Sequence, residues 1–441
     1  MGETASSKPL TIAIAGLGTV GVGVIRLLET NRDLIAARAG RAITVTAVSA
    51  RDRSKDRGVD IAPFAWEDDM TALAGRGDVD VVVELVGGAD GPALALSRAA
   101  LDAGKGLVTA NKAMVAHHGL ALAEAAETAR APLKFEAAVA GGIPVVKGLR
   151  EGTSANALTR VYGILNGTCN YILSQMEASG ADFDEVLAEA QALGYAEADP
   201  TFDIEGIDAA HKLAILAAIG FGARIDFDAV DIVGITGVRA ADIAQADTLG
   251  FVIRLIAEAD IADGHLLQRV RPCLVAKGHP LAPVDGPTNA VVAEGNFSGR
   301  LLFQGAGAGD GPTASAVVAD LIDIARAQGG PGEFGAPFAM PAAQLQPFTP
   351  ADPGERTERT YLRFTVKDRP GVLAEITAAM RDADVSIESL IQKGRAEEGG
   401  EVLVAMVTHE GPEAHVRRAL DLLDGSESLT GAPLVLPILA S

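Results

Sequence analysis

A glycine-rich turn near the N-terminus constrains the fold of this chain most strongly. The turn reads Gly16-Leu17-Gly18-Thr19-Val20-Gly21; it follows an apolar run at 10–15 and precedes an amphipathic segment at 20–29. In a strand–turn–helix of this kind, the first glycine permits the turn, the second admits a pyrophosphate and the third allows close helix packing. The helix N-terminus also offers free N–H groups to phosphates. We therefore predict a dinucleotide-binding site, with an ordinary glycine turn as the alternative.

Short β-branched runs alternate with helical segments over the first 135 residues. We expect strands at 10–15, 43–48, 79–86, 107–109 and 135–139, and helices at 20–29, 92–103 and 120–129. This alternation is typical of the α/β class and predicts a Rossmann-type, doubly wound parallel sheet. We assign 1–135 to a dinucleotide-binding domain and expect a later helix, 313–335, to pack back on it.

The rest of the chain has a different texture, and a length of 441 residues favours two or three domains. Residues 136–340 mix helices with strands and predict an α+β catalytic and dimerisation domain. The expected helices lie at 184–193 and 207–221, and the expected strands at 268–274, 290–293 and 300–304. The stretch 341–358 is rich in Pro, Gln and charge and is interpreted as a linker. Residues 359–441 follow a βαββα order with one more strand, which predicts a ferredoxin-like module.

Charge and cysteine content exclude several classes of protein. The formal net charge of −21 argues against partners such as nucleic acid or an anionic membrane surface. The two cysteines, Cys169 and Cys273, are far apart and match neither a disulfide framework nor a zinc site. The polar stretch 1–9 does not resemble a signal peptide, and the most apolar stretch, 213–221, is too short to span a membrane. We therefore expect a cytoplasmic protein.

The end of the second expected strand bears on which nicotinamide cofactor is bound. An NAD-selective site usually carries Asp or Glu there, to bind the ribose 2′-hydroxyl. Here the strand ends Val48-Ser49-Ala50-Arg51, with Asp52 one residue beyond. Arg51 can pair with a 2′-phosphate, which favours NADP and leaves NAD open. The alternative is a solvated basic loop.

Two further segments carry candidate catalytic side chains. Lys112 follows the strand at 107–109, at the edge where open α/β sheets bind ligands, although a surface lysine is the stronger interpretation of Lys112 alone. Asp208 and Lys212 are four residues apart, so on a helix they share one face. The helix continues with an apolar surface on all sides, which predicts burial, and a buried lysine beside a carbonyl can donate a proton. A solvated ion pair is the alternative.

Acidic residues and histidines lie near these candidates in the sequence, and a cysteine lies between them. The segment 194–208 contains five carboxylates, which suit a substrate that bears an ammonium group. His211 lies beside Lys212 but faces another direction, and His117 and His118 form an isolated pair. We interpret all three histidines as structural and Cys169 as a small buried residue.

Together these segments resemble homoserine dehydrogenase over roughly residues 10–335. The matching pieces are Gly16–Gly21, Thr109–Lys112, Phe135–Pro144, Ile164–Tyr171, Gly194–Lys212 and Gly305–Asp320. The resemblance implies reduction of L-aspartate 4-semialdehyde to L-homoserine with NAD(P)H, on the branch towards threonine, methionine and isoleucine. The run Gly194–Lys212 is its most specific part.

The resemblance also implies roles for individual residues. Lys212 would give its proton to the carbonyl oxygen, and Lys112 would assist between cofactor and substrate. Glu197, Asp208 and Thr168 would bind the substrate, the two acids through its amino group. The cofactor would be lined by the Gly16–Gly21 turn, Arg51, Lys112, Gly194, Gly307 and Gly309. A sodium ion would be held by Glu136, Val139, Gly141 and Ile143, largely through main-chain carbonyls.

The C-terminal module resembles an ACT domain. Asp368-Arg369-Pro370-Gly371-Val372 joins its first strand to its first helix, where such domains bind amino acids. The resemblance implies L-threonine as a feedback inhibitor and a homodimer or homotetramer; a dimerisation appendage without ligand is the alternative. Deleting residues from about 345 onward is then expected to leave activity and abolish inhibition.

Two other functions remain as alternatives. One is a Rossmann dehydrogenase acting on another amino-acid semialdehyde, and the other is a catalytically silent amino-acid sensor. The first leaves the Gly194–Lys212 run unexplained. The second is disfavoured because Lys112, Glu197, Asp208 and Lys212 are all present.

Overall fold

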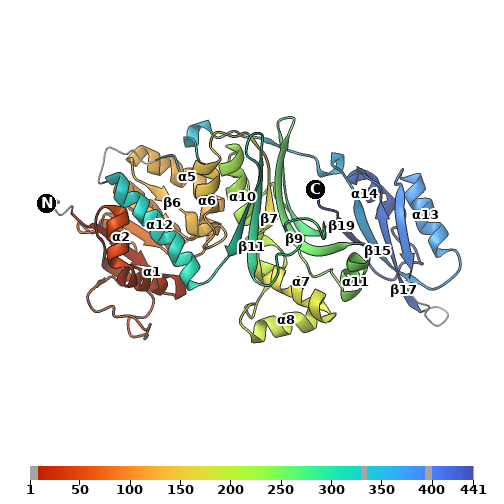
Figure 1. Ribbon diagram of the computed structural model, residues 1–441, viewed down its shortest axis with the longest axis horizontal. Helices are drawn as coiled ribbons and strands as arrows, with labels where there is room; N and C mark the ends of the chain where they lie inside the picture. Colours follow the sequence, from red (N-terminus) through yellow and green to blue (C-terminus); the bar gives the residue numbers. More distant parts are fainter. Residues whose placement is uncertain (1–7, 329–334, 393–399, 441) are drawn as a thin grey trace.

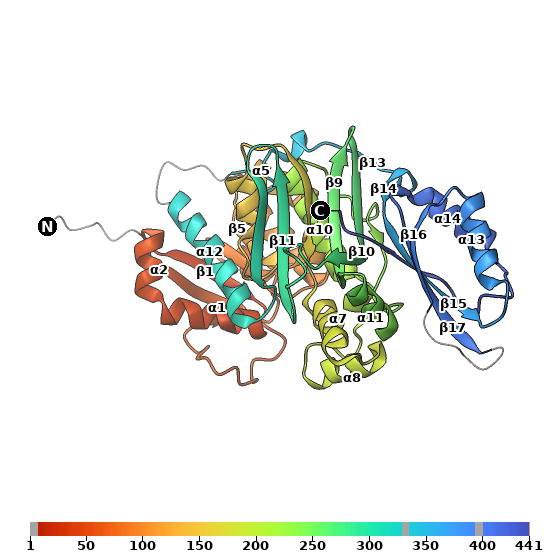
Figure 2. The ribbon, with the colours of Figure 1, turned by 45° about the vertical axis from the view of Figure 1, so that its right-hand side comes forward.

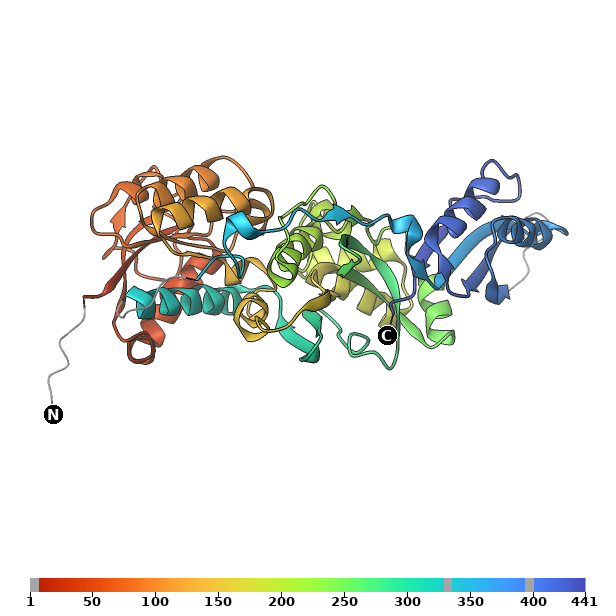
Figure 3. The same ribbon diagram turned by 90° about the horizontal axis from the view of Figure 1, so that it is seen from above.

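Three large sheets follow one another along the long axis of the computed structural model (Figure 1), and the described residues also form a two-stranded sheet, Thr357–Glu358 with Gly411–Pro412. The structure describes residues 8–328, 335–392 and 400–440. In the view from above, the N-terminal, central and C-terminal parts lie in a row (Figure 3). Within the described ranges, no helix combines the length and apolarity needed to cross a membrane.

The N-terminal sheet is parallel throughout, with strand order β3-β2-β1-β4-β5-β6. Its strands are β1 Leu10–Ala15, β2 Ile43–Ser49, β3 Ala65–Trp66, β4 Val81–Glu84, β5 Gly106–Thr109 and β6 Leu133–Lys134. The inner strands are apolar on both faces because helices cover both sides. The strand order reverses between β1 and β4, the switch point where such sheets bind ligands. The predicted Rossmann-type sheet is confirmed.

A helix from much later in the chain completes this domain. α12, Asp310–Gln328, packs against α1, Thr19–Thr30 (Figure 1). Gly23 allows this contact, because a Cβ there would lie 2.9 Å from the carbonyl oxygen of Asp310. The chain therefore enters the N-terminal domain twice. Residues 329–334 of the expected helix lie outside the described residues.

The predicted strand at 135–139 is wrong. β6 ends at Lys134, and residues Glu136–Ala138 form a 3₁₀ turn. The backbone N–H of Glu136 donates to the Asp320 carboxylate, and the Glu136 carboxylate accepts the N–H groups of Val146 and Lys147. These bonds turn the chain away from the sheet and begin α6, Val145–Lys147.

The central sheet is mainly antiparallel, in the order β12-β11-β7-β9-β10-β13, with β8 also paired to β10. Its strands are β7 Leu158–Ile164, β8 Asp231–Ile232, β9 Phe251–Ala262, β10 His265–Ala276, β11 Thr288–Gly295, β12 Gly299–Ala306 and β13 Thr349–Pro350. α10, Ile207–Phe221, is buried from Asp208 to Ile219, which confirms the expected burial. It lies between this sheet and α5, Lys112–Ala129, and so joins the two domains.

The expected linker at 341–358 is bound to the central domain. The N–H of Gln346 donates to Gly222 and its carbonyl accepts from Arg224. Thr349–Pro350 adds strand β13 beside β10, and Thr357–Glu358 forms β14. The segment therefore has fixed neighbours along most of its length.

The C-terminal sheet is antiparallel, in the order β16-β17-β15-β19 (Figure 2). Its elements are β15 Thr360–Lys367, α13 Val372–Asp382, β16 Ile387–Gln392, β17 Glu401–Thr408, α14 Glu413–Leu422 and β19 Leu434–Pro437. The βαββαβ order confirms the ferredoxin-like, ACT-type module. α13 and α14 cover one face, and the other face meets α11, Ala240–Thr248, where Asp242 accepts bonds from Tyr361 and Arg363.

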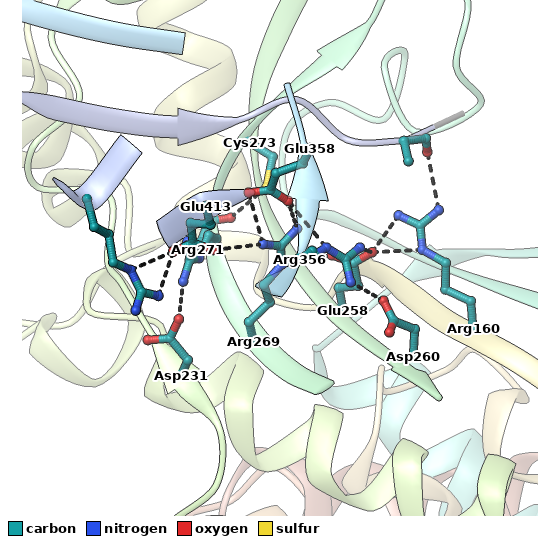
Figure 4. Close-up of polar contacts among 12 residues, drawn as sticks. Arg160, Asp231, Glu258, Asp260, Arg269, Arg271, Cys273, Arg356, Glu358 and Glu413 are labelled. Carbon is teal, nitrogen blue, oxygen red and sulfur yellow. Dashed lines mark hydrogen bonds and ion pairs between the residues drawn. The ribbon is translucent and has the colours of Figure 1, made fainter. Parts of the chain in front are cut away.

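A buried ionic cluster joins the C-terminal and central parts (Figure 4). We call it the interface cluster; it comprises Arg160, Asp231, Glu258, Asp260, Arg269, Arg271, Arg356, Glu358 and Glu413. At its centre, the Glu258 carboxylate accepts from Arg160 at 2.8 Å, Arg356 at 2.8 Å and Arg269 at 2.9 Å. Arg269 also bonds Glu358 at 2.8 Å.

The last residues of the chain lie beside this cluster. Ile438 pairs with Leu274 of β10, and the N–H of Leu439 donates to the Leu274 carbonyl at 2.9 Å. The carbonyl of Ala440 accepts from Arg160 at 3.2 Å. The C-terminal segment therefore packs on the central sheet.

Candidate active site

A cavity of about 1280 Å³ lies between the carboxyl edge of the N-terminal sheet and the central domain. It brings together many of the predicted residues from distant parts of the sequence. Among those lining it are Val20, Lys112, Gly141, Thr168, Gly194, Glu197, Asp208, Lys212, Gly307 and Gly309. The candidate residues that are not among its lining are Gly16, Leu17, Gly18, Thr19, Gly21, Arg51, Glu136, Val139 and Ile143.

Two lysines share one carboxylate at the wall of this cavity. Asp208 Oδ2 lies 2.7 Å from Lys212 Nζ, and Asp208 Oδ1 lies 2.8 Å from Lys112 Nζ. Lys212 also donates to the carbonyl oxygen of Leu165 at 2.7 Å. Lys112 begins α5, whereas Asp208 and Lys212 lie one turn apart on α10. We call these three side chains the cavity cluster.

The two lysines differ in burial, and their pKa values shift in opposite directions. The side chain of Lys212 is 10 % exposed and that of Lys112 is 35 % exposed. Burial lowers the pKa of Lys212, although the charge of Asp208 acts against it. Burial would also lower the pKa of Lys112, but the charge and hydrogen bond of Asp208, together with the charges of Asp203 and Glu197, outweigh burial and raise this pKa. Asp208 is itself desolvated, yet the two ammonium groups hold its pKa well below the usual range.

A third donor, Asn166, fixes the carboxylates of the cavity. Its side-chain nitrogen donates to Asp208 Oδ2 at 2.9 Å and to Asp203 Oδ1 at 2.7 Å. Its side-chain oxygen accepts from Cys169 and caps α7, Gly167–Ser179. Asn166 was not predicted to have a role in the site. An N-cap residue before the run 167–179 was the available signal.

The rim of the cavity carries further acidic groups. Glu197 is exposed and adds to the negative potential that acts on Lys112. Asp203 lies deeper, and burial followed by the charge of Asp208 raises its pKa. The hydroxyl of Thr168 is 2.9 Å from the carbonyl of Tyr195 and 3.3 Å from Asp203. The rim therefore combines carboxylates with the N-terminus of α7.

The glycine-rich turn leaves room for a dinucleotide. Gly16 has φ +98°, and a Cβ there would lie 2.6 Å from the carbonyl oxygen of Leu85. A Cβ at Gly21 would lie 2.1 Å from the carbonyl oxygen of Gly16. At Gly18, by contrast, no described atom lies within 4 Å of such a Cβ. This pattern fits the three glycine roles of a pyrophosphate-binding turn.

The loop after β2 is basic and touches this turn. Arg57 donates to the carbonyl of Leu17 at 3.2 Å, and its guanidinium lies 5.9 Å from the ring centre of Trp66. Arg53 lies 5.8 Å from the same ring, and Arg51 is exposed at the end of the strand. Sequence reasoning singled out Arg51 and missed Arg57, which lies near Leu17 only in the folded chain.

Buried polar contacts fix the loop that presents Lys112. Glu84, at the end of β4, accepts the Thr109 hydroxyl at 2.5 Å and the N–H groups of Val86 and Gly87. The N–H of Asn111 donates to Thr109 Oγ1 at 3.0 Å. Glu84 therefore joins two loops of the cofactor edge.

The segment implied for sodium does not offer side-chain ligands. The Glu136 carboxylate is already bonded to the N–H groups of Val146 and Lys147. Burial, together with Asp320, raises the pKa of Glu136 to about 7. Among the described residues, no group of three or more His, Cys, Asp or Glu side chains could hold a metal ion. The side chains at the four implied positions therefore offer no cation site.

A second cavity, of about 550 Å³, lies in the C-terminal module. It is lined by the turn between β15 and α13, including Asp368, Arg369 and Gly371, and by Gln392 of the edge strand β16. Ser428 accepts from Arg369 at 3.0 Å and donates to Glu375 at 2.5 Å. The turn predicted to bind an amino acid therefore borders a cavity with ample room for one.

Comparisons with known proteins agree across the whole chain. Residues 144–322 match the family model described as homoserine dehydrogenase, 16–136 match its NAD-binding domain and 360–422 match the ACT domain. Homoserine dehydrogenase of Pseudomonas aeruginosa is 44 % identical over 427 residues, which cover 96 % of this chain and 97 % of that protein. The Mycobacterium tuberculosis enzyme is 43 % identical over 440 residues, with 97 % of each chain covered.

Solved structures agree with these matches. A homoserine dehydrogenase from Thiobacillus denitrificans superposes with a TM-score of 0.92 at 40 % identity and covers 98 % of each chain. A hyperthermophilic archaeal homoserine dehydrogenase in complex with NADPH has a TM-score of 0.62 at 25 % identity. It covers 74 % of this chain and 100 % of its own.

Proposed function

This chain belongs to the homoserine dehydrogenase family, and on that premise we propose how its residues carry out the reaction. The protein is an NAD(P)-dependent oxidoreductase that acts on a CH–OH group, and it carries an ACT domain. The observation that carries the proposal is the pair of lysines on one buried carboxylate at the cavity wall.

Lys212 acts as the proton donor. A bound reduced nicotinamide would supply hydride to the aldehyde carbon, so that negative charge develops on the carbonyl oxygen. Lys212 Nζ gives its proton to that oxygen, which completes the alcohol and leaves a neutral amine. Its lowered pKa supports this transfer, because a weaker hold on the proton suits a general acid. Lys112, whose pKa is raised, keeps its charge and stabilises the developing oxyanion.

The acids take different roles. The Asp208 carboxylate already contacts Lys112, Lys212 and Asn166. We therefore assign Asp208 to positioning the two lysines, and any contact with the substrate amino group is secondary. Glu197 and Asp203 face the same cavity, and we propose that they bind the substrate ammonium.

The substrate carboxylate is assigned to the N-terminus of α7. The N–H groups of Gly167 and Thr168 lie in the first turn of that helix. N–H groups in a first turn have no acceptor within the helix, so they can bind a ligand. They line the cavity beside the rim acids. A carboxylate is favoured at such a position by the free N–H groups and the helix dipole.

For the cofactor we propose NADP, with Arg51, Arg53 and Arg57 near the 2′-phosphate, and NAD as the weaker alternative. Replacing Arg57 with Ala is expected to raise KM for NADPH about tenfold and KM for NADH less than twofold, the loss of about one charge-assisted bond. Equal changes for both cofactors would remove this argument. A sodium ion on main-chain carbonyls stays a prediction from the family resemblance.

We further propose L-threonine as the ligand of the C-terminal cavity and a homo-oligomer as the working form. Strand β12 is an edge of the central sheet, and its Leu302 is 43 % exposed, which suits pairing with a second copy. Homoserine oxidation, measured with NADP and with NAD at increasing threonine, tests the cofactor and the effector together. An unchanged rate at saturating threonine would reject the effector. A cytoplasmic location stays a prediction from composition.

The lysine arrangement is tested by Asp208→Asn, which keeps the shape of the side chain and removes its charge. We expect kcat to fall about 10²-fold or more, since both lysines lose the counter-charge that positions them. Glu205→Gln is the matched control, because Glu205 belongs to the same acidic run and is not among the residues lining the cavity. A kcat within twofold of wild type for Asp208→Asn contradicts the proposal.

A further inference from the structure

An imidazole pair lies directly behind the cavity cluster, and the reaction as proposed does not use it. His211 precedes Lys212 on α10 and is 3 % exposed. Its Nε2 lies 3.1 Å from Nε2 of His117, which belongs to α5. This bond joins the helix that begins with Lys112 to the helix that carries Asp208 and Lys212.

The ring of His211 also supports a third element of the site. It stacks on Phe202 of α9, Thr201–Ile204, with centroids 5.5 Å apart. On another side it stacks on Phe227 at 4.4 Å, with the planes inclined by 13°. Phe202 in turn lies 5.6 Å from Lys112 Nζ. The same short helix carries Asp203, one of the rim acids.

The protonation state of His211 is compatible with a stable hydrogen bond to His117. Burial, followed by the charge of His117 and opposed by Asp208, lowers the pKa of His211 to about 4. The imidazole is therefore neutral near pH 7 and can share one proton with His117 across the 3.1 Å gap. Nδ1 of His211 is buried without a hydrogen-bond partner among the described residues. Burying an unpaired nitrogen is unfavourable, so the other contacts of His211 must hold the ring in this position.

We propose that His211 is a positioning residue, which sets the separation of Lys112, Lys212 and the rim acid Asp203 by joining α5, α9 and α10. It touches no substrate and acts through Phe202 and His117. The proposal rests on the proposed function of the cavity cluster. Because Asp208→Asn tests the cluster without altering the imidazole pair, failure of the two proposals can be distinguished.

The test is a double-substitution cycle on the pair. His117→Phe removes one imidazole and leaves Nε2 of His211 unpaired, and His211→Phe keeps the ring stack on Phe202 but loses the bond. We expect each single change to lower kcat about tenfold and to raise KM for the semialdehyde, since small displacements of reacting groups are costly. KM for NADPH should stay within twofold, because the glycine-rich turn is remote from the pair. The double variant should recover part of kcat, since an apolar pair leaves no unpaired group.

The control is His118→Phe, on the same helix. His118 bonds Asp90 at 2.8 Å, away from the cavity, and its loss should leave kcat and both KM values within twofold. His117 is exposed on one side, so His117→Phe is the variant expected to fold even if His211→Phe does not. The proposal is overturned if kcat and the semialdehyde KM of His117→Phe stay within twofold of wild type. It is also overturned if the two single effects simply add.

Discussion

The cavity cluster and the interface cluster share the same arrangement of charges in two different parts of the molecule. Each has a buried carboxylate, Asp208 or Glu258, that receives several cations. In each case burial raises the pKa of the acid, and the cations lower it further than burial raises it. The two sites differ in the cation and in access: lysines beside an open cavity in one, and arginines between two packed domains in the other.

The choice of lysine or arginine distinguishes the proposed catalytic site from the contact between two domains. A lysine changes its pKa with burial and can release a proton, whereas the guanidinium of arginine stays charged and bonds in a fixed fork. Burial therefore lowers the pKa of Lys212 and lets it act as an acid. At Arg269 burial has the same sign, but the charges of Glu258 and Glu358 outweigh it and raise the pKa, so the guanidinium stays charged and holds its partners. Buried ion pairs by themselves do not identify an active site; the kind of cation and the neighbouring cavity do.

Lys212→Arg gives the cavity cluster the cation of the interface cluster. The charge is kept, but the proton is no longer available. We expect kcat to fall about 10²–10⁴-fold, the usual contribution of a general acid. Steady-state rates with NADPH, together with the thermal midpoint, measure this. A variant with kcat near wild type would show that Lys212 acts by charge alone.

The second test removes the central acid of the interface cluster. Glu258→Gln leaves three arginines facing a neutral amide, and we expect the free energy of unfolding to fall by about 3–5 kcal/mol. The kcat of the folded enzyme should stay within about threefold. Glu388→Gln is the control, because its pair with Arg359 is exposed and worth about 0.5 kcal/mol or less. Equal losses from both variants would remove the distinction between buried and exposed pairs.

The two clusters also differ in how acid affects the stability of the fold. Glu258 is desolvated, which raises its pKa, but Arg269 and its neighbours lower it to about 2. A lowered pKa stabilises the fold above the ordinary value, and this contribution is lost as the pH falls towards 2. Between pH 5 and pH 2.5, wild type should therefore lose up to about 3 kcal/mol more than Glu258→Gln. Urea unfolding at several pH values measures the difference, and parallel curves would contradict it.

The smallest expected effect comes from the converse exchange, Arg269→Lys. The positive charge remains, but the fork to Glu258 and Glu358 is reduced to single contacts. We expect a loss of about 1–3 kcal/mol in unfolding free energy and no change in kcat. Chemical denaturation of the two proteins side by side gives the result. An unchanged midpoint would mean that charge, and not geometry, holds the interface.

Local patterns predicted the fold because its strands are short apolar runs and its turns are glycines. The GxGxxG turn, the burial of α10 and the βαββαβ order could all be expected from neighbouring residues. Strand β9 was not predicted, although its partner β10 was in part, because a long hairpin inside a packed core lacks alternation. The turn at Glu136 was missed because its cause, Asp320, lies 184 positions away.

The site was predictable to the extent that its residues are close in sequence. Asp208 and Lys212 are one helical turn apart, so their pairing follows from spacing. Asn166, the Leu165 carbonyl and the contact between His117 and His211 join segments separated by 40 to 100 positions, and no spacing indicates them. Their positions follow only from the packed structure.

The contacts of residues 438–440 make the central sheet depend on the C-terminal module. Ile438, Leu439 and Ala440 bond to Leu274 and Arg160 of the central sheet. Ala440 and Arg160 are 280 positions apart, so the central sheet takes part of its packing from the far side of the C-terminal module. Deleting residues from about 345 onward would remove these neighbours of β10 together with the cavity of the module. A loss of inhibition in such a deletion would therefore come with a weakened central sheet, whereas single substitutions in the turn after β15 keep the two effects apart.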